Sequence, residues 1–510
     1  MPPPRKLSPQ SVWDTNAVLQ AFQEEGIKPM HAVRMWGHLI RHPESSWHDV
    51  PDMPRAALAL LDKYFSKWTT RVVRCQTSSD ASTTKLLVEL QDGMQVEAVV
   101  MTYEGPSRDP QLLARNGGTE VANGPEVDPH LPVDHRLQPD EDQEEEEEGE
   151  GEEGRQQQGR EGREQAGEEG QEVEAVCGRS SAECCRGGGG GRCSDSGKGA
   201  AAEASSSAPS ITSASGRGAA AAAAVRSRRR STLCVSSQVG CQMGCTFCAT
   251  GTMGLKGHLN AGEIVEQLLH ARAVTRIRNI VFMGMGEPLN NYEAVRSAVS
   301  MMTDSRYFGL RRRHVTVSTV GVIPRIKQLA EELPGVSLAL SLHAPTQELR
   351  AQIVPSARAY KLPALMAAVR AYQASSCQKV FYEYVMLAGV NDGLEQAHQL
   401  GQLLQGDDVV INLIPWNPIY QPEGPFFQAP AEGSVEAFQG VLRHTYGLHT
   451  TIRQEMGQDI SGACGQLVIE AGGGGGCSRE AVQGGSGCGS GGTTRDIEDA
   501  VRKVGLGPVA

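Results

Sequence analysis

Three cysteines, Cys241, Cys245 and Cys248, lie within residues 233–253 and have the spacing C-x₃-C-x₂-C. Thiolates are the ligands that hold iron–sulfur clusters. Three of them on one loop can bind three irons of a [4Fe–4S] cube, which leaves the fourth iron open to an outside ligand. The spacing therefore predicts an iron–sulfur cluster with one reactive iron.

Other uses of these cysteines remain open at this point. Zinc sites usually take four ligands arranged as two pairs, and no second pair lies close to these cysteines in the sequence. A disulfide is not expected because we see no signal peptide at the start of the chain. A zinc site, a disulfide and chance spacing are thus the alternatives to a cluster.

The cysteine motif, with Phe247 before its last cysteine, resembles that of the radical S-adenosylmethionine (SAM) superfamily. Five ordered motifs extend this likeness: LCVSSQVGC at 233–241, MGMGEPL at 283–289, SLHAP at 341–345, INLIPWNP at 411–418 and ACGQL at 463–467. Together they resemble the RlmN-type dual-specificity RNA methyltransferases, from about residue 231 to residue 467. The resemblance implies methylation of carbon 2 of an adenosine in ribosomal RNA, transfer RNA or both.

The resemblance also implies roles for individual residues. Cys464 is expected to carry a methyl group as S-methylcysteine, and Cys234 to release the methylated RNA by forming a disulfide with Cys464. Glu97 is the expected proton acceptor. The expected SAM contacts are Gly286, Glu287, Ser318, Ser341, Leu342, His343 and Asn417. The expected ligands of the [4Fe–4S] cluster are Cys241, Cys245 and Cys248.

The implied reaction uses two SAM molecules per turnover: one methylates Cys464, and the other is split by the reduced cluster to a radical that activates the methyl group. A flavodoxin- or ferredoxin-type donor is expected to reduce the cluster. We expect a monomer that binds RNA. We expect no membrane contact, because the sequence has no apolar run of about 18 residues.

Taken without the resemblance, the same residues have plainer interpretations. Glu97 would be a solvent-facing strand residue, His343 a structural histidine, and Cys234 and Cys464 buried structural cysteines. The alternative functions are methylation at carbon 8 of adenine, or an inactive iron–sulfur protein that binds RNA or carries electrons. The two cysteines favour an enzyme, because neither inactive role needs them.

Strand and helix patterns alternate in the second half of the chain, which predicts βαβ units with a parallel sheet. The expected strands are 231–237, 279–283, 314–319, 336–342, 380–386 and 409–414. The expected helices are 261–274, 292–302, 324–333, 363–373, 394–404 and 435–446. This α/β pattern predicts an open (β/α)₆ partial barrel, the fold that the resemblance also implies. The motifs follow the strands, and ligands bind at the carboxyl ends of such strands.

The rest of the chain divides by composition. Residues 1–75 are expected to form a small helical domain, with helices at 12–23, 32–42 and 54–67; it either binds RNA, as the resemblance implies, or simply packs around a small core. Residues 76–104 are expected to form a β-hairpin linker, with strands at 85–90 and 96–101. Further regions are an acidic, Gly- and Ala-rich insertion at 105–225 that is expected to be disordered, the barrel at 226–470, and a Gly-rich tail at 471–510.

The net charge of −12 is concentrated in one segment. Residues 105–225 contain 25 acidic and 11 basic residues, and the remainder of the chain has a net charge of +2. The acidity therefore does not exclude an RNA partner, and Arg311, Arg312 and Arg313 are either phosphate contacts or a solvated turn. A cluster and free thiols call for a reducing compartment. We expect the cytoplasm, with a chloroplast or mitochondrion as alternatives, because the first residues do not suggest a transit peptide.

Overall fold

The computed structural model describes residues 5, 7–103, 230–419 and 427–467. All of them belong to one compact unit. The insertion predicted at 105–225 and the tail predicted at 471–510 lie outside the described residues. The division into five domains stays a prediction.

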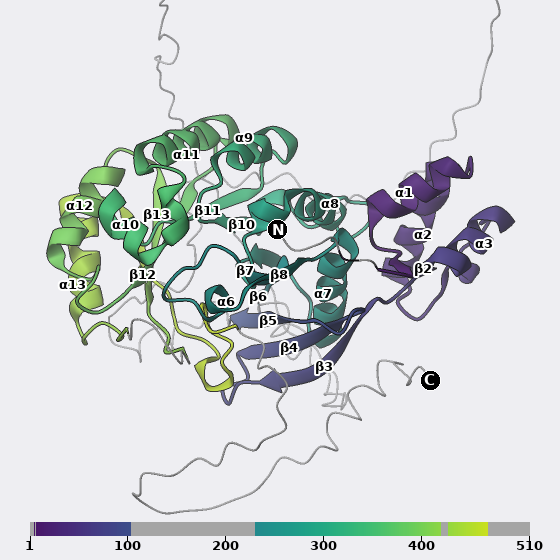
Figure 1. Cartoon of the computed structure of the whole chain (residues 1–510), viewed down its shortest axis with the longest axis horizontal. Helices are drawn as coiled ribbons and strands as arrows, with labels where there is room; N and C mark the ends of the chain where they lie inside the picture. The colour runs from purple at the N-terminus through teal and green to yellow at the C-terminus, as the bar shows by residue number, and fades with distance from the viewer. Residues whose placement is uncertain (1–4, 6, 104–229, 420–426, 468–510) are drawn as a thin grey trace, which may run out of the picture. The chain divides into compact units, whose positions relative to one another are not determined.

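Seven parallel strands form the main part of a ten-stranded sheet (Figure 1). In spatial order they are β6 (Arg230–Cys234), β9 (Asn279–Phe282), β10 (Val315–Thr319), β11 (Ser337–Ser341), β12 (Val380–Met386), β13 (Val409–Pro415) and β14 (His449–Ile452). The first six are the strands predicted for the open (β/α)₆ barrel. The seventh, β14, extends the sheet beyond them.

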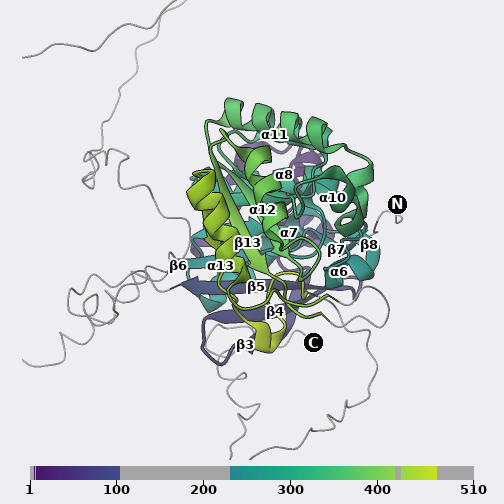
Figure 2. The same ribbon diagram turned by 90° about the vertical axis from the view of Figure 1, so that its left-hand side faces the viewer.

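The crossover helices cover the outer face of the parallel strands (Figures 1 and 2). They are α7 (Ala261–Val274), α8 (Tyr292–Thr303), α9 (Ile323–Glu332), α11 (Leu362–Ser376), α12 (Leu394–Leu404) and α13 (Ser434–Gly440). The helix predicted at 435–446 is divided, because a π-helical turn at Val441–Thr445 follows α13. Two shorter helices, α6 (Ala249–Thr252) and α10 (Gln347–Ile353), were not predicted.

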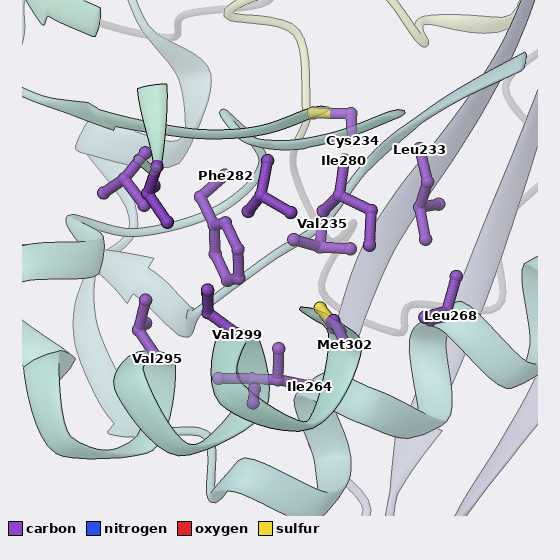
Figure 3. Packing of buried hydrophobic residues seen from close by; sticks show 14 of the residues in the cluster. Leu233, Cys234, Val235, Ile264, Leu268, Ile280, Phe282, Val295, Val299 and Met302 are labelled. Carbon is purple, nitrogen blue, oxygen red and sulfur yellow. The ribbon is translucent and has the colours of Figure 1, made fainter. Parts of the chain in front are cut away.

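The alternation of side chains along β6 separates the core from the site. Leu233 and Val235 point toward α7 and α8, where Ile264 and Met302 complete the apolar packing (Figure 3). Cys234 lies on the opposite side of the strand (Figure 3), as the two-residue period of a strand requires. One short segment thus contributes to the core and to the interior of the barrel.

Three antiparallel strands extend the sheet past β6: β3 (Thr70–Thr77), β4 (Thr83–Leu90) and β5 (Gln95–Tyr103). Strand β5 pairs with β6, so that Val99 lies opposite Cys234, and Tyr103 opposite Arg230. The predicted hairpin is therefore present as β4 and β5, but it is part of the main sheet. Strand β3 was not predicted because its exposed residues do not alternate with apolar ones.

Two small sheets complete the strands. Strand β1 (Gln10–Ser11) pairs in parallel with β2 (Phe65–Ser66). Strand β7 (Gln238–Cys241) pairs with β8 (Gly254–His258) in an antiparallel ladder. The second ladder closes the base of the loop that contains the three motif cysteines.

The N-terminal helices α1 (Thr15–Glu24), α2 (Pro29–Arg41) and α3 (Arg55–Tyr64) lie near the predicted positions, and α1 contacts α8 (Figure 1). The buried carboxylate of Glu266 in α7 accepts hydrogen bonds from Ser11 Oγ (2.6 Å) and from the amides and hydroxyls of Thr69 and Thr70. These bonds join the N-terminal segment to the barrel. Among the described residues, no helix has the length and apolar character needed to cross a membrane.

Candidate active site

A cavity lies at the carboxyl ends of the parallel strands. The three motif cysteines, Cys241, Cys245 and Cys248, all line it. So do most of the predicted SAM contacts and the predicted methyl carrier: Gly286, Glu287, Ser318, Ser341, His343, Asn417 and Cys464. Leu342 is fully buried and is not part of the lining. The structure thus brings together residues that end or follow six strands: β7, β9, β10, β11, β13 and β14.

The cysteine loop is held from two sides. Thr246 donates its amide to the carbonyl of Ile353 at the end of α10 (3.0 Å), and Ala249 donates its amide to the carbonyl of Gly465 (2.8 Å). The ring of Phe247 packs edge-on against His343, with 4.7 Å between ring centres. The loop is therefore fixed against both α10 and the segment that carries Cys464.

The donor set fits a cluster better than a single ion. In the part of the chain that the structure describes, no three His, Cys, Asp or Glu side chains are close enough to hold one metal ion. A [4Fe–4S] cluster does not need three ligands on one ion, because each thiolate binds a different iron of the cube. Burial raises the pKa of the Cys241 thiol to about 12 and also raises the pKa values of Cys245 and Cys248. Such thiols stay protonated unless a metal stabilises the thiolate.

All cysteines in the described residues are free, which leaves no disulfide there.

The loop after β9 has a backbone that only glycine accommodates. Gly286 has φ +101°, and a Cβ on it would lie 2.5 Å from Cβ of Gln238. Gln238 Oε1 accepts the amide of Glu287 (2.7 Å), and the Glu287 carboxylate accepts the amides of Leu289 (3.0 Å) and Val320 (2.9 Å). Burial raises the pKa of Glu287 to about 7. The carboxylate is thereby fixed at the cavity wall.

The ends of β10 and β11 present hydroxyls to the cavity. Ser318 Oγ and Ser341 Oγ lie 3.3 Å apart. Next to them, His343 Nδ1 accepts the amide of Val385 (3.1 Å), which leaves the ring proton on Nε2. Burial, and then the charge of Arg350, lowers the pKa of His343 to about 3. The imidazole is therefore neutral at physiological pH.

Cys464 also lines a second cavity, together with Cys234. The Cys464 segment is positioned by Asn417, whose Nδ2 donates to the Cys464 carbonyl (3.1 Å) and whose Oδ1 accepts from Gln458 (2.7 Å). Burial, and then Cys464, raises the pKa of the Cys234 thiol to about 12, while Arg453 opposes this rise. The two predicted catalytic cysteines therefore share one cavity.

Glu97 lies outside the residues that line either cavity. Its side chain is buried and forms an ion pair with Lys85 Nζ (2.9 Å), which also donates to the carbonyl of Ser461 (3.3 Å). Glu97 is thus linked to the Cys464 segment through Lys85. Its role as proton acceptor stays a prediction.

Two charged residues at the site were not predicted. Arg453 lines both cavities, and its Nη1 lies 3.7 Å from Oε2 of the buried Glu383. Nearby Cys464 raises the pKa of Arg453 above its ordinary value. Glu383 could have been noticed as a charge within the apolar strand VFYEYVM. Arg453 follows β14, which the sequence pattern did not reveal.

The exposed Arg311, Arg312 and Arg313 precede β10. They therefore lie at the amino end of that strand, whereas the cavity lies at the carboxyl ends. A contact between these arginines and RNA phosphates stays a prediction.

Comparison with known proteins agrees with the geometry of the site. The family model described as the radical SAM superfamily matches residues 235–400. A dual-specificity RNA methyltransferase RlmN 1 from Myxococcus xanthus is 47% identical over 249 residues, which cover 48% of this chain and 68% of the relative. The chain belongs to the RlmN family of radical SAM RNA methyltransferases. Two further RlmN-type relatives are the RlmN of Syntrophobacter fumaroxidans (45% identical, covering 48% of this chain and 71% of the relative) and the ribosomal RNA large subunit methyltransferase N of Nitrosopumilus maritimus (44%, covering 47% and 68%).

A solved structure has the same fold as this RlmN-family chain. The radical SAM methyltransferase from Sphaerobacter thermophilus has a TM-score of 0.60 and 28% identity, covering 90% of this chain and 99% of that one. RlmN membership identifies the chain as an RNA methyltransferase with a [4Fe–4S] cluster and SAM as cofactors. The predicted fold class and family are thereby confirmed.

Proposed function

We propose that the chain methylates carbon 2 of an adenosine in ribosomal RNA, transfer RNA or both, with Cys464 as the methyl carrier. The observation that supports this most strongly is the position of Cys464, which lines the cavity of the three motif cysteines and also the cavity of Cys234. A methyl carrier needs the first cavity, where SAM can donate the methyl group to it. It also needs the second cavity, where Cys234 can release the methylated product. The name of the Nitrosopumilus maritimus relative supports a ribosomal RNA substrate.

In this proposal Cys241, Cys245 and Cys248 hold the cluster. SAM binds against Gly286, Glu287, Ser318, Ser341, His343 and Asn417, which line the cavity. When bound, the cluster and SAM supply a carbon-centred radical, which is needed because carbon 2 of adenine is not nucleophilic enough to attack a SAM methyl group. The described chain supplies the remaining chemistry with its own side chains.

Cys464 acts first, as a nucleophile. Its thiolate forms a bond to the methyl carbon of SAM, and the electron pair of the broken carbon–sulfur bond leaves with S-adenosylhomocysteine. The positive charge of Arg453 stabilises the thiolate. The target base must be unstacked to reach the cavity.

Cys234 acts last. After the carried carbon has bonded to carbon 2, the adduct is a radical and must give up one electron, which the oxidised cluster held by the three motif cysteines would accept. A base also removes the carbon 2 proton, and Glu97 is our proposed proton acceptor. The Cys234 thiolate then attacks Sγ of Cys464, and a disulfide forms. The electron pair of the broken carbon–sulfur bond passes to the methylene carbon, which takes up a proton and becomes the methyl group. An external thiol reductant must reopen the disulfide.

We also propose that α1–α3 contact the RNA, that a flavodoxin- or ferredoxin-type protein donates the electron, and that the chain works as a monomer in a reducing compartment such as the cytoplasm. These proposals extend the family resemblance.

Analysis of the methylated nucleoside tests the proposed reaction. The anaerobically reconstituted chain is incubated with SAM, a reductant and unmethylated ribosomal or transfer RNA, and the digested RNA is compared with 2-methyladenosine and 8-methyladenosine standards by mass spectrometry. We expect 2-methyladenosine. Appearance of 8-methyladenosine would assign the other carbon, and absence of methylated adenosine in both RNAs would reject the proposed substrates.

A further inference from the structure

Arg350, in α10, is fully buried behind the cavity wall. Its Nε donates to the carbonyl of Leu342 (3.0 Å), and its Nη2 donates to the carbonyls of Val320 (2.6 Å) and Ser341 (3.1 Å). Its Nη1 is buried without a hydrogen-bond partner. The guanidinium is thus held at the ends of β10 and β11 by main-chain oxygens.

The charge of Arg350 has no acidic partner among the described residues: the ion pairs found there do not include it. Carbonyls accept hydrogen bonds from its Nε and Nη2 but do not neutralise its charge, and a buried charge is costly unless it is paired. Burial accordingly lowers the pKa of Arg350 to about 10, and the neighbour that opposes this is Cys245. A negative charge at the cysteine loop would supply the missing partner.

The helix of Arg350 packs directly against that loop. The carbonyl of Ile353 accepts hydrogen bonds from the amide (3.0 Å) and the hydroxyl (3.2 Å) of Thr246, between Cys245 and Cys248. Ile353 and Phe247 belong to one buried apolar cluster, and Cys245 and Cys248 pack against it. Charges interact strongly across such weakly polarisable surroundings.

We propose that Arg350 is the counter-charge of the cluster held by Cys241, Cys245 and Cys248, and that its positive charge raises the potential at which the cluster accepts an electron. A cluster with three thiolates is negatively charged, and one electron from an external donor adds to that charge. A nearby cation stabilises the reduced form more than the oxidised form. Net charge and surroundings are among the factors that set cluster potentials. The proposal rests on the ligand assignment under Proposed function.

Three variants of the full chain separate charge from shape. Arg350→Gln removes the charge, and Arg350→Lys keeps it. Arg358→Gln removes a positive charge from an exposed position near α10, where water screens it. After anaerobic reconstitution, iron and acid-labile sulfide are counted, and the midpoint potential is measured by redox titration with electron paramagnetic resonance. We expect a more negative potential in Arg350→Gln alone, with Arg350→Lys and Arg358→Gln close to the parent.

An unchanged potential in Arg350→Gln, or an equal shift in Arg350→Lys, would overturn the proposal. If Arg350→Gln fails to retain the cluster, retention at the parental potential in Arg350→Lys supports a need for the charge. Loss of the cluster from both variants, with Arg358→Gln intact, would instead show that shape matters and would also overturn it. Failure of the ligand assignment is distinguishable, because the parent itself would then bind no iron.

Discussion

Cys464 and Cys234 have different surroundings although they share a cavity. Cys464 also faces the cavity of the three motif cysteines, whereas Cys234 lines only the second cavity, at the end of β6. In the proposed reaction, the cysteine that takes a methyl group from SAM needs the first position, and the cysteine that only breaks the final bond needs the second. The geometry therefore favours the order in which Cys464 reacts first.

Substitution of each cysteine separates these two roles. Cys464→Ala should form no RNA adduct, because the methyl carrier is missing. Cys234→Ala should still methylate Cys464 and add to the base, then stall as a covalent RNA–protein complex. Nuclease digestion and peptide mass spectrometry should find the nucleotide on the peptide of Cys464. Free turnover by Cys234→Ala, or an adduct on Cys234, would contradict the assignment.

Release of the product from the RNA adduct should depend on pH. Burial raises the pKa of Cys234 to about 12, so its thiolate fraction at neutral pH is small and should increase about tenfold per pH unit. Decay of the pre-formed RNA adduct should therefore accelerate between about pH 7 and 9. Arg453→Gln should slow this decay, because Arg453 lowers the pKa of Cys234, and Arg453→Lys should slow it less. A decay rate independent of pH would exclude Cys234 ionisation as the controlling step.

Among individual residues of the site, the sequence predicted those that belong to motifs and missed those that do not. The cysteine spacing led directly to the cavity. Arg350 and Glu383 were missed because their importance comes from burial, and Arg453 was missed because it follows β14, which was not predicted. In the sequence, Arg350 resembles any arginine on an amphipathic helix, and only the packing of α10 removes it from water.

Among the secondary-structure elements, the loops at the strand ends determine the shape of the site. Gly286 is the clearest case, because its φ of +101° and its closeness to Gln238 both exclude a side chain. The loop positions Glu287, whose carboxylate is bound by main-chain amides. A change at Gly286 should therefore act on SAM binding through the backbone.

Gly286→Ala should weaken SAM binding and lower the free energy of unfolding. Backbone strain should cost about 1–2 kcal/mol, and overlap with Gln238 should add about 1–3 kcal/mol. Gly389→Ala is the matched control, because Gly389 has φ +69° but no atom within 4 Å of a built Cβ. Equilibrium dialysis with SAM and urea unfolding measure the two effects. Equal losses in both variants would show that overlap with Gln238 is unimportant.

The sequence predicted the longer helices and missed several short elements. The bounds of α7 and α12 agree with the prediction residue by residue. Strand β14, with the sequence HTTI, has no apolar alternation. It forms because it pairs in parallel with β13. The seven-residue α10 was missed because it is short, although the hydroxyl of Thr346 accepts the amide of Leu349 and caps its start.

In the molecule as a whole, a polar contact joins the segments on either side of the N-terminal helices to α7. The Glu266 carboxylate satisfies donors from Ser11, Thr69 and Thr70 in a buried setting. Glu266→Gln should lower the free energy of unfolding by about 1–3 kcal/mol, because the NH₂ group of glutamine would face hydrogen-bond donors that the carboxylate now accepts. Glu293→Gln, at a surface ion pair, should cost about 0–1 kcal/mol. Urea unfolding measures both changes. Equal losses of unfolding free energy in Glu266→Gln and Glu293→Gln would contradict a stabilising role for the buried Glu266 contact.

The segment between β5 and β6 should be dispensable for the chemistry. Tyr103 and Arg230, at its two ends, are direct partners in the antiparallel ladder, so a short connection can join them. A chain without residues 110–222 should therefore fold, bind its cluster and methylate RNA in vitro within a fewfold of the parent. Inactivity of a shortened chain that still held its cluster would show that the segment takes part in the reaction.

The same pairing sets an order of events during translation. Strand β5 leaves the ribosome well before β6, because residues 104–229 separate them. At roughly 5–20 residues per second, the outer edge of β5 waits on the order of ten seconds for its partner. An unpaired edge invites association with other chains. The nascent chain is therefore most vulnerable in this interval, and the shortened chain, in which β6 follows β5 almost at once, should give a larger soluble yield.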